Sequence, residues 1–162
     1  MSLGGRPRDG DSDVLVVSAC LLGDACRYDG QGKASTPVLE LVAERRLQGR
    51  PVRPVCPEEL GGLGTPRPAA HLQGGDGHGI LDGTATVRRV EDGADVTEAF
   101  LTGARRAAEV GAPIGRAILK ARSPSCGCGS TWIDGEVTRG DGVFAALLRR
   151  QGVPIQTDED LV

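Results

Sequence analysis

The chain has 162 residues and a mass of 16.8 kDa, which suffices for one domain with a buried core and no disulfide support. Hydrophobic residues make up 39% and charged residues 25%, so wholesale disorder is excluded and a compact fold is expected. The net charge of -3 argues against general nucleic-acid binding. No apolar run approaches the ~20 residues of a membrane span, and no signal peptide is evident, so we expect a cytoplasmic protein without a membrane partner.

The first predicted elements are a tail, a strand and a helix. Residues 1–12 are polar and glycine-rich, so we expect a mobile N-terminal tail ahead of a single domain over residues 13–162. Residues 14–19 form a continuous apolar run, typical of a strand buried on both faces, and the run ends at Cys20. A helix is predicted over residues 36–48, because threonine and proline are typical of a helix start and the following glycine of its end.

The middle of the chain is predicted to contain a long loop. A short strand is expected over residues 52–55, directly before Cys56. Residues 57–83 show little periodicity and many glycines, which predicts a long ordered loop. Residues 84–90 are expected to be a strand that leads into a capped helix, which ends at Gly111.

The last third of the chain again alternates between strands and helices. A buried strand over residues 117–119 is expected to run into the sequence Ser-Pro-Ser-Cys at 123–126. An Asp-Gly turn signal lies within residues 132–137. An amphipathic helix is predicted over residues 141–150, followed by a last strand over residues 153–156.

Strands that alternate with helices predict an α/β fold. We therefore expect a single three-layer domain with a mainly parallel sheet flanked by helices. Ligands of such sheets bind outside the carboxyl ends of the strands. Cys20, Cys56 and Cys126 each directly follow a predicted strand, so we expect them to converge at one edge of the sheet.

The three strand-end cysteines predict a shared metal or cluster site. The chain has five cysteines, and their odd number argues against a disulfide scaffold. No C-x-x-C motif is present, so the paired ligands of structural zinc are not indicated, although zinc stays open. A cubane iron–sulfur cluster accepts thiolates that are widely spaced in sequence. Three ligands would leave one iron open to polarise a substrate atom, preferably sulfur.

Acid and hydroxyl groups lie beside these cysteines in the sequence. Glu58 and Glu59 follow Cys56 closely, and a carboxylate there can activate water or move protons. The alternative, of equal weight, is that these two glutamates lie in the first turn of a helix, where acidic side chains stabilise the helix dipole. Ser123 and Ser125 immediately precede Cys126.

The two remaining cysteines, a glycine-rich segment and the two histidines each allow more than one interpretation. Cys26 is an alternative ligand, and Cys128 is either a packing residue, an adjacent donor or a redox partner of its neighbour. The glycine-rich residues 74–79 fit no phosphate-binding motif, and no helix is predicted to begin there. His71 and His78 are candidate ligands or simply solvated side chains.

Five ordered motifs carry a resemblance to a known family. They are Ser18-Ala19-Cys20-Leu21-Leu22-Gly23, Cys26-Arg27-Tyr28-Asp29-Gly30, Pro54-Val55-Cys56-Pro57-Glu58, Leu60-Gly61-Gly62-Leu63 with Thr65-Pro66-Arg67-Pro68, and Ile118-Leu119-Lys120 with Ser123-Pro124-Ser125-Cys126-Gly127. Over nearly the whole chain the sequence resembles the bacterial domain-of-unknown-function family that contains the thiouracil desulfidases.

The resemblance implies a [4Fe-4S] cluster, held by Cys20, Cys56 and Cys126, whose fourth iron binds the sulfur of a thiolated pyrimidine. It implies a non-redox reaction in which water replaces sulfur and sulfide is released. The catalytic residues that it implies are Glu58 and Ser123. Ser125 is the alternative to Ser123.

The resemblance specifies the residues that contact the substrate less closely than it specifies the cluster ligands. Four residues are candidate substrate contacts or loop braces: Arg27, Tyr28, Asp29 and Arg67. The chain departs from the family pattern at Gly64, at His71, where the family usually has an acid, and from Cys128 to Trp132. These departures concern the shape of the substrate rather than the cluster ligands.

The main alternative is a zinc or iron–sulfur protein that acts as a sulfur carrier or sensor without desulfidase activity. A third interpretation is an interaction module with five buried thiols. The natural substrate and the oligomeric state are not specified by the sequence. A cluster with an exposed iron is expected to be oxidation-prone, so that it is absent or replaced in an aerobic sample.

Overall fold

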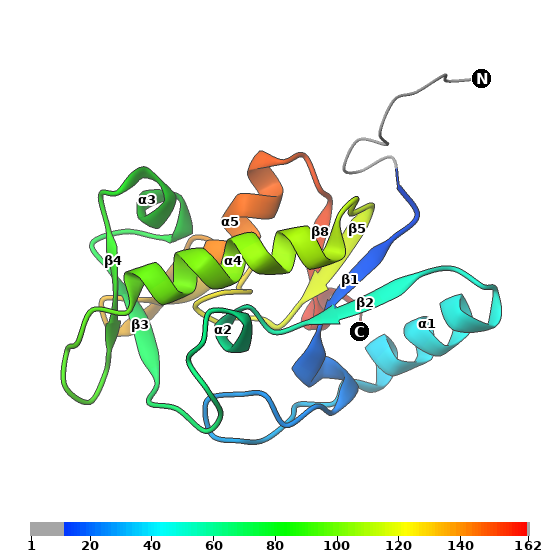
Figure 1. Ribbon diagram of the computed structural model, residues 1–162, viewed down its shortest axis with the longest axis horizontal. Coiled ribbons are helices and arrows are strands. Elements are labelled where there is room, and N and C mark those ends of the chain that lie inside the picture. Colours follow the sequence, from blue (N-terminus) through cyan, green and yellow to red (C-terminus); the bar gives the residue numbers. More distant parts are fainter. Residues whose placement is uncertain (1–11, 162) are drawn as a thin grey trace.

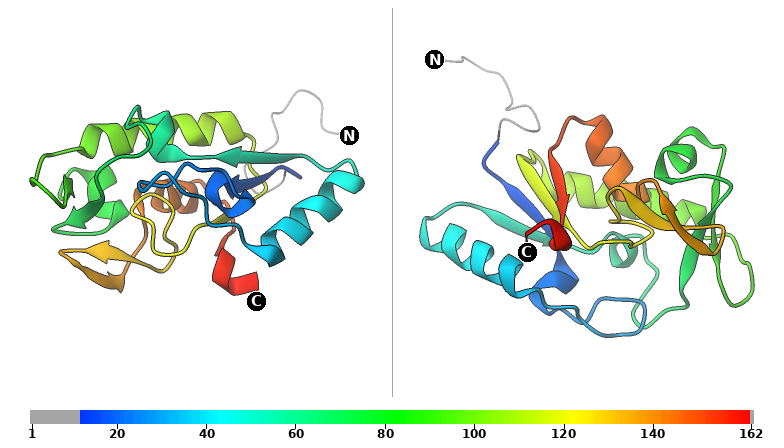
Figure 2. Two further views of the ribbon diagram at one scale, coloured as in Figure 1. Left: turned by 90° about the horizontal axis from the view of Figure 1, so that it is seen from below. Right: turned by 180° about the vertical axis from the view of Figure 1, so that it is seen from behind.

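A computed structural model describes residues 12–161, so the tail expected over residues 1–12 lies, except for Ser12, outside the described residues (Figure 1). Four parallel strands form the first sheet, in the order β2-β1-β5-β8. Their bounds are β1 Leu15–Ser18, β2 Val52–Val55, β5 Arg116–Leu119 and β8 Ile155–Thr157. Helix α1 (Thr36–Leu47) covers one face of this sheet, and α4 (Thr97–Gly111) and α5 (Val143–Arg150) cover the other (Figure 2). The predicted three-layer α/β fold is confirmed.

Strand β1 lies at the centre of both hydrophobic cores. Its side chains alternate, so that Leu15 and Val17 pack on the α1 side while Val16 packs on the side of α4 and α5. All three side chains are fully buried. This two-sided burial explains why the strand is a continuous apolar run in the sequence.

A second sheet stands beside the first and was not predicted. Its strand order is β4-β3-β6-β7, with bounds β3 Ala70–Gln73, β4 Thr86–Arg89, β6 Ser130–Ile133 and β7 Glu136–Arg139. Strands β3 and β6 are parallel, whereas β3–β4 and β6–β7 are antiparallel. The expected turn joins β6 to β7 through Asp134 and Gly135, whose φ values of 51° and 83° suit a tight hairpin. Figure 1 places β3 and β4 at the opposite end of the molecule from α1.

The expectation of one long loop over residues 57–83 was wrong. This segment contains α2 (Pro57–Leu60), β3 and α3 (Gly77–Asp82). Helices of four and six residues are too short to produce a helical hydrophobic pattern, and β3 buries only Leu72. The expectation that no helix begins within residues 74–79 was also wrong, because α3 starts there with Asp76 as its N-cap. The Asp76 carboxylate accepts from two backbone N–H groups of α3, so an acid already occupies the end at which a phosphate would bind.

Two short 3-10 helices, η1 (Ala19–Leu22) and η2 (Asp158–Leu161), complete the architecture around the parallel sheet. Strand β1 has β2 on one side and β5 on the other, so the chain winds outward from β1 in both directions. The carboxyl ends of these three strands therefore meet at the point where open α/β sheets bind ligands.

Candidate active site

A cavity of about 420 Å³ opens at the carboxyl ends of β1, β2 and β5 and extends to the start of β3. Twenty-two residues line it, and they include Cys20, Cys26, Cys56, Cys126, Glu58, Arg67, Ser123, Arg27, Tyr28, Lys33, Lys120, Arg122, His71 and Trp132. The cavity thus has thiols, a carboxylate and several cations along its walls. Both sheets contribute to it.

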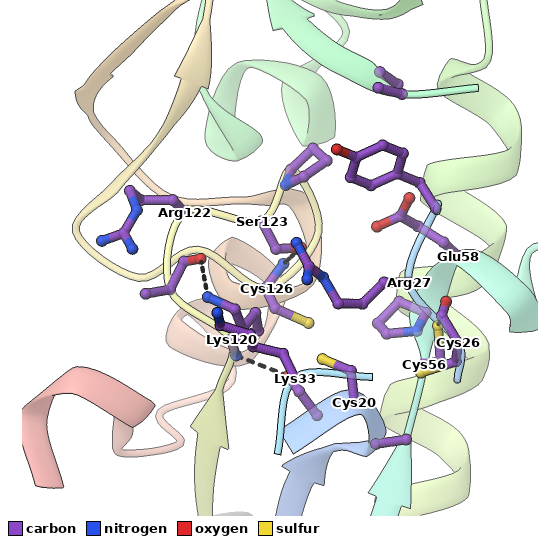
Figure 3. A pocket seen from close by; sticks show the side chains of 18 of the residues that line it. Cys20, Cys26, Arg27, Lys33, Cys56, Glu58, Lys120, Arg122, Ser123 and Cys126 are labelled. Atoms are coloured by element: carbon purple, nitrogen blue, oxygen red, sulfur yellow. Dashed lines mark hydrogen bonds between the residues drawn. The ribbon is translucent and has the colours of Figure 1, made fainter. Parts of the chain in front are cut away.

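The strand ends bring the predicted cysteines to this one cavity (Figure 3). Cys20 lies in η1 directly after β1, and Cys56 directly follows β2. Cys126 was expected to follow β5 directly, but it ends a seven-residue loop after that strand. Figure 3 shows the sulfur atoms of Cys20 and Cys126 facing one another, with Cys26 and Cys56 side by side.

All five thiols are free, and four of them line the cavity. Burial raises the pKa of the Cys126 thiol to about 12, and its own side chain is 4% exposed. The pKa of Cys56 is also raised, first by its hydrogen bond with the Cys26 thiol and then by burial. At neutral pH these groups are thiols, and binding as thiolates requires a compensating cation in the cavity.

Glu58 is the carboxylate of the cavity, and it is held on two sides. The Nε of Arg67 lies 3.1 Å from its Oε1, and the Ser125 hydroxyl donates to its Oε2 at 3.4 Å. The Arg67 side chain is 5% exposed and the Glu58 side chain 14%, so this is a largely buried ion pair. Burial raises the pKa of Glu58, and the guanidinium of Arg67 opposes that shift.

Arg67 also holds the loop before β3. Its Nη1 donates to the carbonyl of Gly64 at 2.8 Å and to Thr65 Oγ1 at 3.0 Å, while its backbone N–H donates to the carbonyl of Tyr28. The bracing role that was one of two alternatives for Arg67 is therefore visible. The same side chain lines the cavity.

The two candidate serines have different positions. Ser123 lines the cavity, and its Oγ accepts the backbone N–H groups of Ser125 and Cys126 at 3.2 and 3.1 Å. Those bonds use the oxygen lone pairs and leave the Ser123 O–H to donate. Ser125 is 2% exposed and lies behind Glu58, outside the cavity lining.

Some of the remaining predicted substrate contacts line the cavity and others do not. Arg27 and Tyr28 line the cavity, whereas Asp29 does not and accepts the backbone N–H of Gln31 in a turn. The sequence did not single out the cations Lys33, Lys120 and Arg122, which also line the cavity.

A polar cluster outside the cavity also contains potential metal-binding atoms. The ligand atoms of Asp76, His78 and Asp141 lie within 4.8 Å of one another. However, the Nε of Arg149 is 2.8 Å from Asp141 and that of Arg150 is 3.3 Å from the His78 ring. Two guanidinium groups already neutralise this cluster, so it is a structural network and not a metal site.

Comparison with known proteins identifies the family. The model of the 2-thiouracil desulfurase family matches residues 15–160. The chain belongs to this family. The chain is 38% identical over 153 residues to the uncharacterized protein YbbK of Bacillus subtilis (strain 168), across 91% of this chain and 97% of YbbK.

A solved structure supports the same family assignment. The [4Fe-4S]-dependent thiouracil desulfidase TudS is 38% identical, superposes with a TM-score of 0.75, and the match covers 93% of each chain. The desulfurase family and the fold that the motifs implied are therefore confirmed. Within the described residues 12–161, no helix is long and apolar enough to cross a membrane.

Proposed function

We propose that the protein is a [4Fe-4S]-dependent desulfidase that converts thiolated pyrimidines, thiouracil or its nucleoside or nucleotide, into the oxo form. The reaction consumes one water and releases one sulfide, without net oxidation or reduction. The observation that supports this proposal is the convergence of Cys20, Cys56 and Cys126 on one cavity that also contains the Glu58 carboxylate. TudS, with 38% identity, is an enzyme of this kind.

The donor set fits a cluster. Cys20 and Cys56 directly follow two adjacent strands and Cys126 ends the loop after the third, so the three thiols reach the cavity from three separate segments. A cubane separates its irons in space and accepts such ligands, with thiolate as its preferred donor. Cys26 lies beside Cys56, within 4.8 Å of it and of Glu59, and this closer grouping suits a single small ion rather than a cubane. We therefore assign Cys26 as a neighbour of the cluster rather than a ligand.

When bound by three cysteines, a cluster supplies one open iron, a Lewis acid that can polarise a thiocarbonyl sulfur. The role of Glu58 is to accept a proton from the attacking water at Oε1 or Oε2, because Glu58 lines the cavity and its two oxygens have fixed partners. Arg67 and Ser125 hold that carboxylate in place. The Ser123 hydroxyl orients the same water or donates to the substrate, since its oxygen accepts two backbone N–H groups and its O–H remains a donor.

Unpaired cations favour a negatively charged occupant of the cavity. Among residues 12–161, Arg27, Lys33 and Lys120 make no ion pair, although all three line the cavity. Their charge would offset that of a thiolate-bound cluster and attract a substrate phosphate. The free thiols fit a reducing compartment, so we propose a cytoplasmic location.

The first test measures iron, acid-labile sulfide and the visible spectrum of protein reconstituted without oxygen. We expect about four irons per chain. Cys20→Ala and Cys126→Ala should abolish this loading, whereas the matched controls Cys26→Ser and Cys128→Ser should retain it. An iron-free chain that instead binds zinc through Cys26 would contradict the proposal and favour the carrier or sensor alternative.

The second test separates the chemistry from the cluster. Glu58→Gln should retain iron and the visible spectrum but lower sulfide release from thiouracil about 10²- to 10⁴-fold, the usual contribution of a positioned base. Glu59→Gln is the matched control, because Glu59 lies outside the cavity lining and should remain active. Full activity of the Glu58 variant would remove this residue from the mechanism.

A further inference from the structure

A stacked pair of rings forms part of the cavity wall on the second sheet. His71 lies in β3 and Trp132 in β6, and their ring centroids are 4.9 Å apart with an interplanar angle of 7°. Both residues line the cavity that contains the cysteines. The pair exists only because β3 and β6 are neighbours in the sheet.

The two rings are not part of the hydrophobic core. Side chains alternate along each strand, so that Leu72 and Ile133 point into the core while their neighbours His71 and Trp132 point away from it. Trp132 remains 38% exposed, which is a large exposed aromatic surface in a chain with only four aromatic residues besides histidine. Core packing therefore does not account for these rings.

The polar edges of the pair are also unused. Within the described residues, the His71 ring makes no hydrogen bond and its contact is the stack with Trp132. Burial lowers the pKa of His71, so the imidazole is neutral at neutral pH. The two rings cover each other's inner faces, and an outer face of a neutral, parallel ring pair beside a cavity is suited to stacking against a further planar ring.

We propose that His71 and Trp132 form a stacking wall that binds the pyrimidine ring of the substrate. The inference rests on the proposed function, because the wall belongs to the same cavity, and it adds that the protein selects planar heteroaromatic thiocarbonyl compounds over ring-free thioamides. Stacking recognises a ring face and makes no contact with the reacting sulfur. The wall is therefore a specificity determinant that acts on KM and not on kcat.

The single tryptophan makes this testable without catalysis. Trp132 is the only tryptophan in the sequence, so intrinsic fluorescence reports on the wall alone. The full chain, with and without a reconstituted cluster, is titrated with uracil and with uridine 5′-monophosphate, which carry the ring but no sulfur. Ribose 5-phosphate, which has no ring, is the control. We expect saturable quenching by the two pyrimidines and none by ribose 5-phosphate.

Matched variants separate the wall from the fold. His71→Ala should raise the Kd for uracil several-fold, whereas His71→Phe, which keeps a ring, should retain it. Trp132→Ala should raise KM for thiouracil about tenfold at unchanged kcat, and Trp132→Phe should restore KM. Val137→Ala removes the exposed cross-strand neighbour of Trp132 outside the cavity and should change neither constant.

The outcomes distinguish this inference from the proposed function. No saturable quenching by uracil in either preparation, or equal quenching by ribose 5-phosphate, would overturn the stacking wall. An active desulfidase without quenching leaves the function standing and removes the wall. A chain that binds uracil but releases no sulfide supports the wall and contradicts the proposed function.

Discussion

The two sheets of the protein are built on different principles. In the parallel sheet, every residue of β1 is buried, and so are three of the four residues of β5. In the second sheet, β7 is exposed along its whole length, and β3 and β4 each bury one residue. The parallel sheet carries the core, whereas the second sheet shares one core layer and otherwise faces solvent and the cavity.

Because of this difference, the first sheet mainly determines stability and the second sheet mainly contributes to ligand recognition. The cysteine-bearing segments follow β1, β2 and β5, and the last residue of each of these strands is buried, so that packing fixes where the segments start. The ring pair lies on the outward faces of β3 and β6, where side chains tolerate change because they are outside the core. We therefore expect substitutions in the first sheet to unfold the protein and substitutions on the outer face of the second to alter ligand preference.

The largest expected effect is in the parallel sheet. Ile118 of β5 is fully buried against Leu15, Val17 and α1. Ile118→Ala should lower the free energy of unfolding by about 2–5 kcal/mol, because it removes buried methylene groups and leaves a cavity. Urea unfolding followed by circular dichroism measures this loss.

The matched substitution in the second sheet should do far less. Val137 of β7 is 46% exposed, so Val137→Ala should change the free energy of unfolding by no more than about 0.5 kcal/mol. Equal losses for the two variants would show that the second sheet is as much a part of the core as the first.

The difference in burial between the two sheets also explains which strands could be predicted from the sequence. Strands β1 and β5 of the parallel sheet are visible as apolar runs, because burial on both faces leaves no polar alternation. Strand β3 has one buried residue among glycines and prolines, and its partner β6 lies far along the chain. Neither local composition nor periodicity records that pairing, so β3 and the assembly of a second sheet were missed, although a strand at the position of β4 and the turn between β6 and β7 were predicted.

In the candidate site, too, features carried by local sequence were predicted and a feature created by long-range pairing was not. Cys20, Cys56 and Glu58 were predicted because the strand ends and motifs that carry them are local. The stacking of His71 on Trp132 was not, since long-range strand pairing creates it. Asp29 was included because it belongs to the same motif as Arg27 and Tyr28, yet its carboxylate turns toward its own loop.

A smaller effect is expected where α2 packs on α4. A Cβ on Gly103 would lie 1.9 Å from the carbonyl oxygen of Pro57, the first residue of the helix that carries Glu58. Gly103→Ala should therefore cost about 1–3 kcal/mol of stability and displace Glu58, which lowers sulfide release as well. The exposed Arg105 on the same helix supplies the control, since Arg105→Ala should leave both measurements unchanged. A stable, fully active Gly103 variant would show that α2 shifts freely.

A smaller loss than at Gly103 is expected at Asp141, at the junction between the two regions. Its carboxylate accepts from Arg149 of α5 and from the backbone N–H of Gly129, which precedes β6. Burial alone would raise the pKa of Asp141, but the hydrogen bonds from Arg149, Gly129 and His78 lower it below the ordinary value of 3.8. Asp141→Asn should cost about 1 kcal/mol at pH 7, because neutral groups make weaker hydrogen bonds with arginine.

The pH dependence of that cost tests the role of the charge. Because the folded-state pKa is lowered, the stabilisation by Asp141 is complete above 3.8 and is lost as the pH falls through the folded-state pKa. Unfolding free energies of the native chain and the Asp141→Asn variant should therefore differ at pH 7 and converge in acid. Asp92, which pairs with Arg89 on the exposed side of the second sheet, is the matched control, and Asp92→Asn should leave stability unchanged at pH 7. A constant difference for Asp141→Asn at all pH values would mean that shape rather than charge joins the two regions at this point.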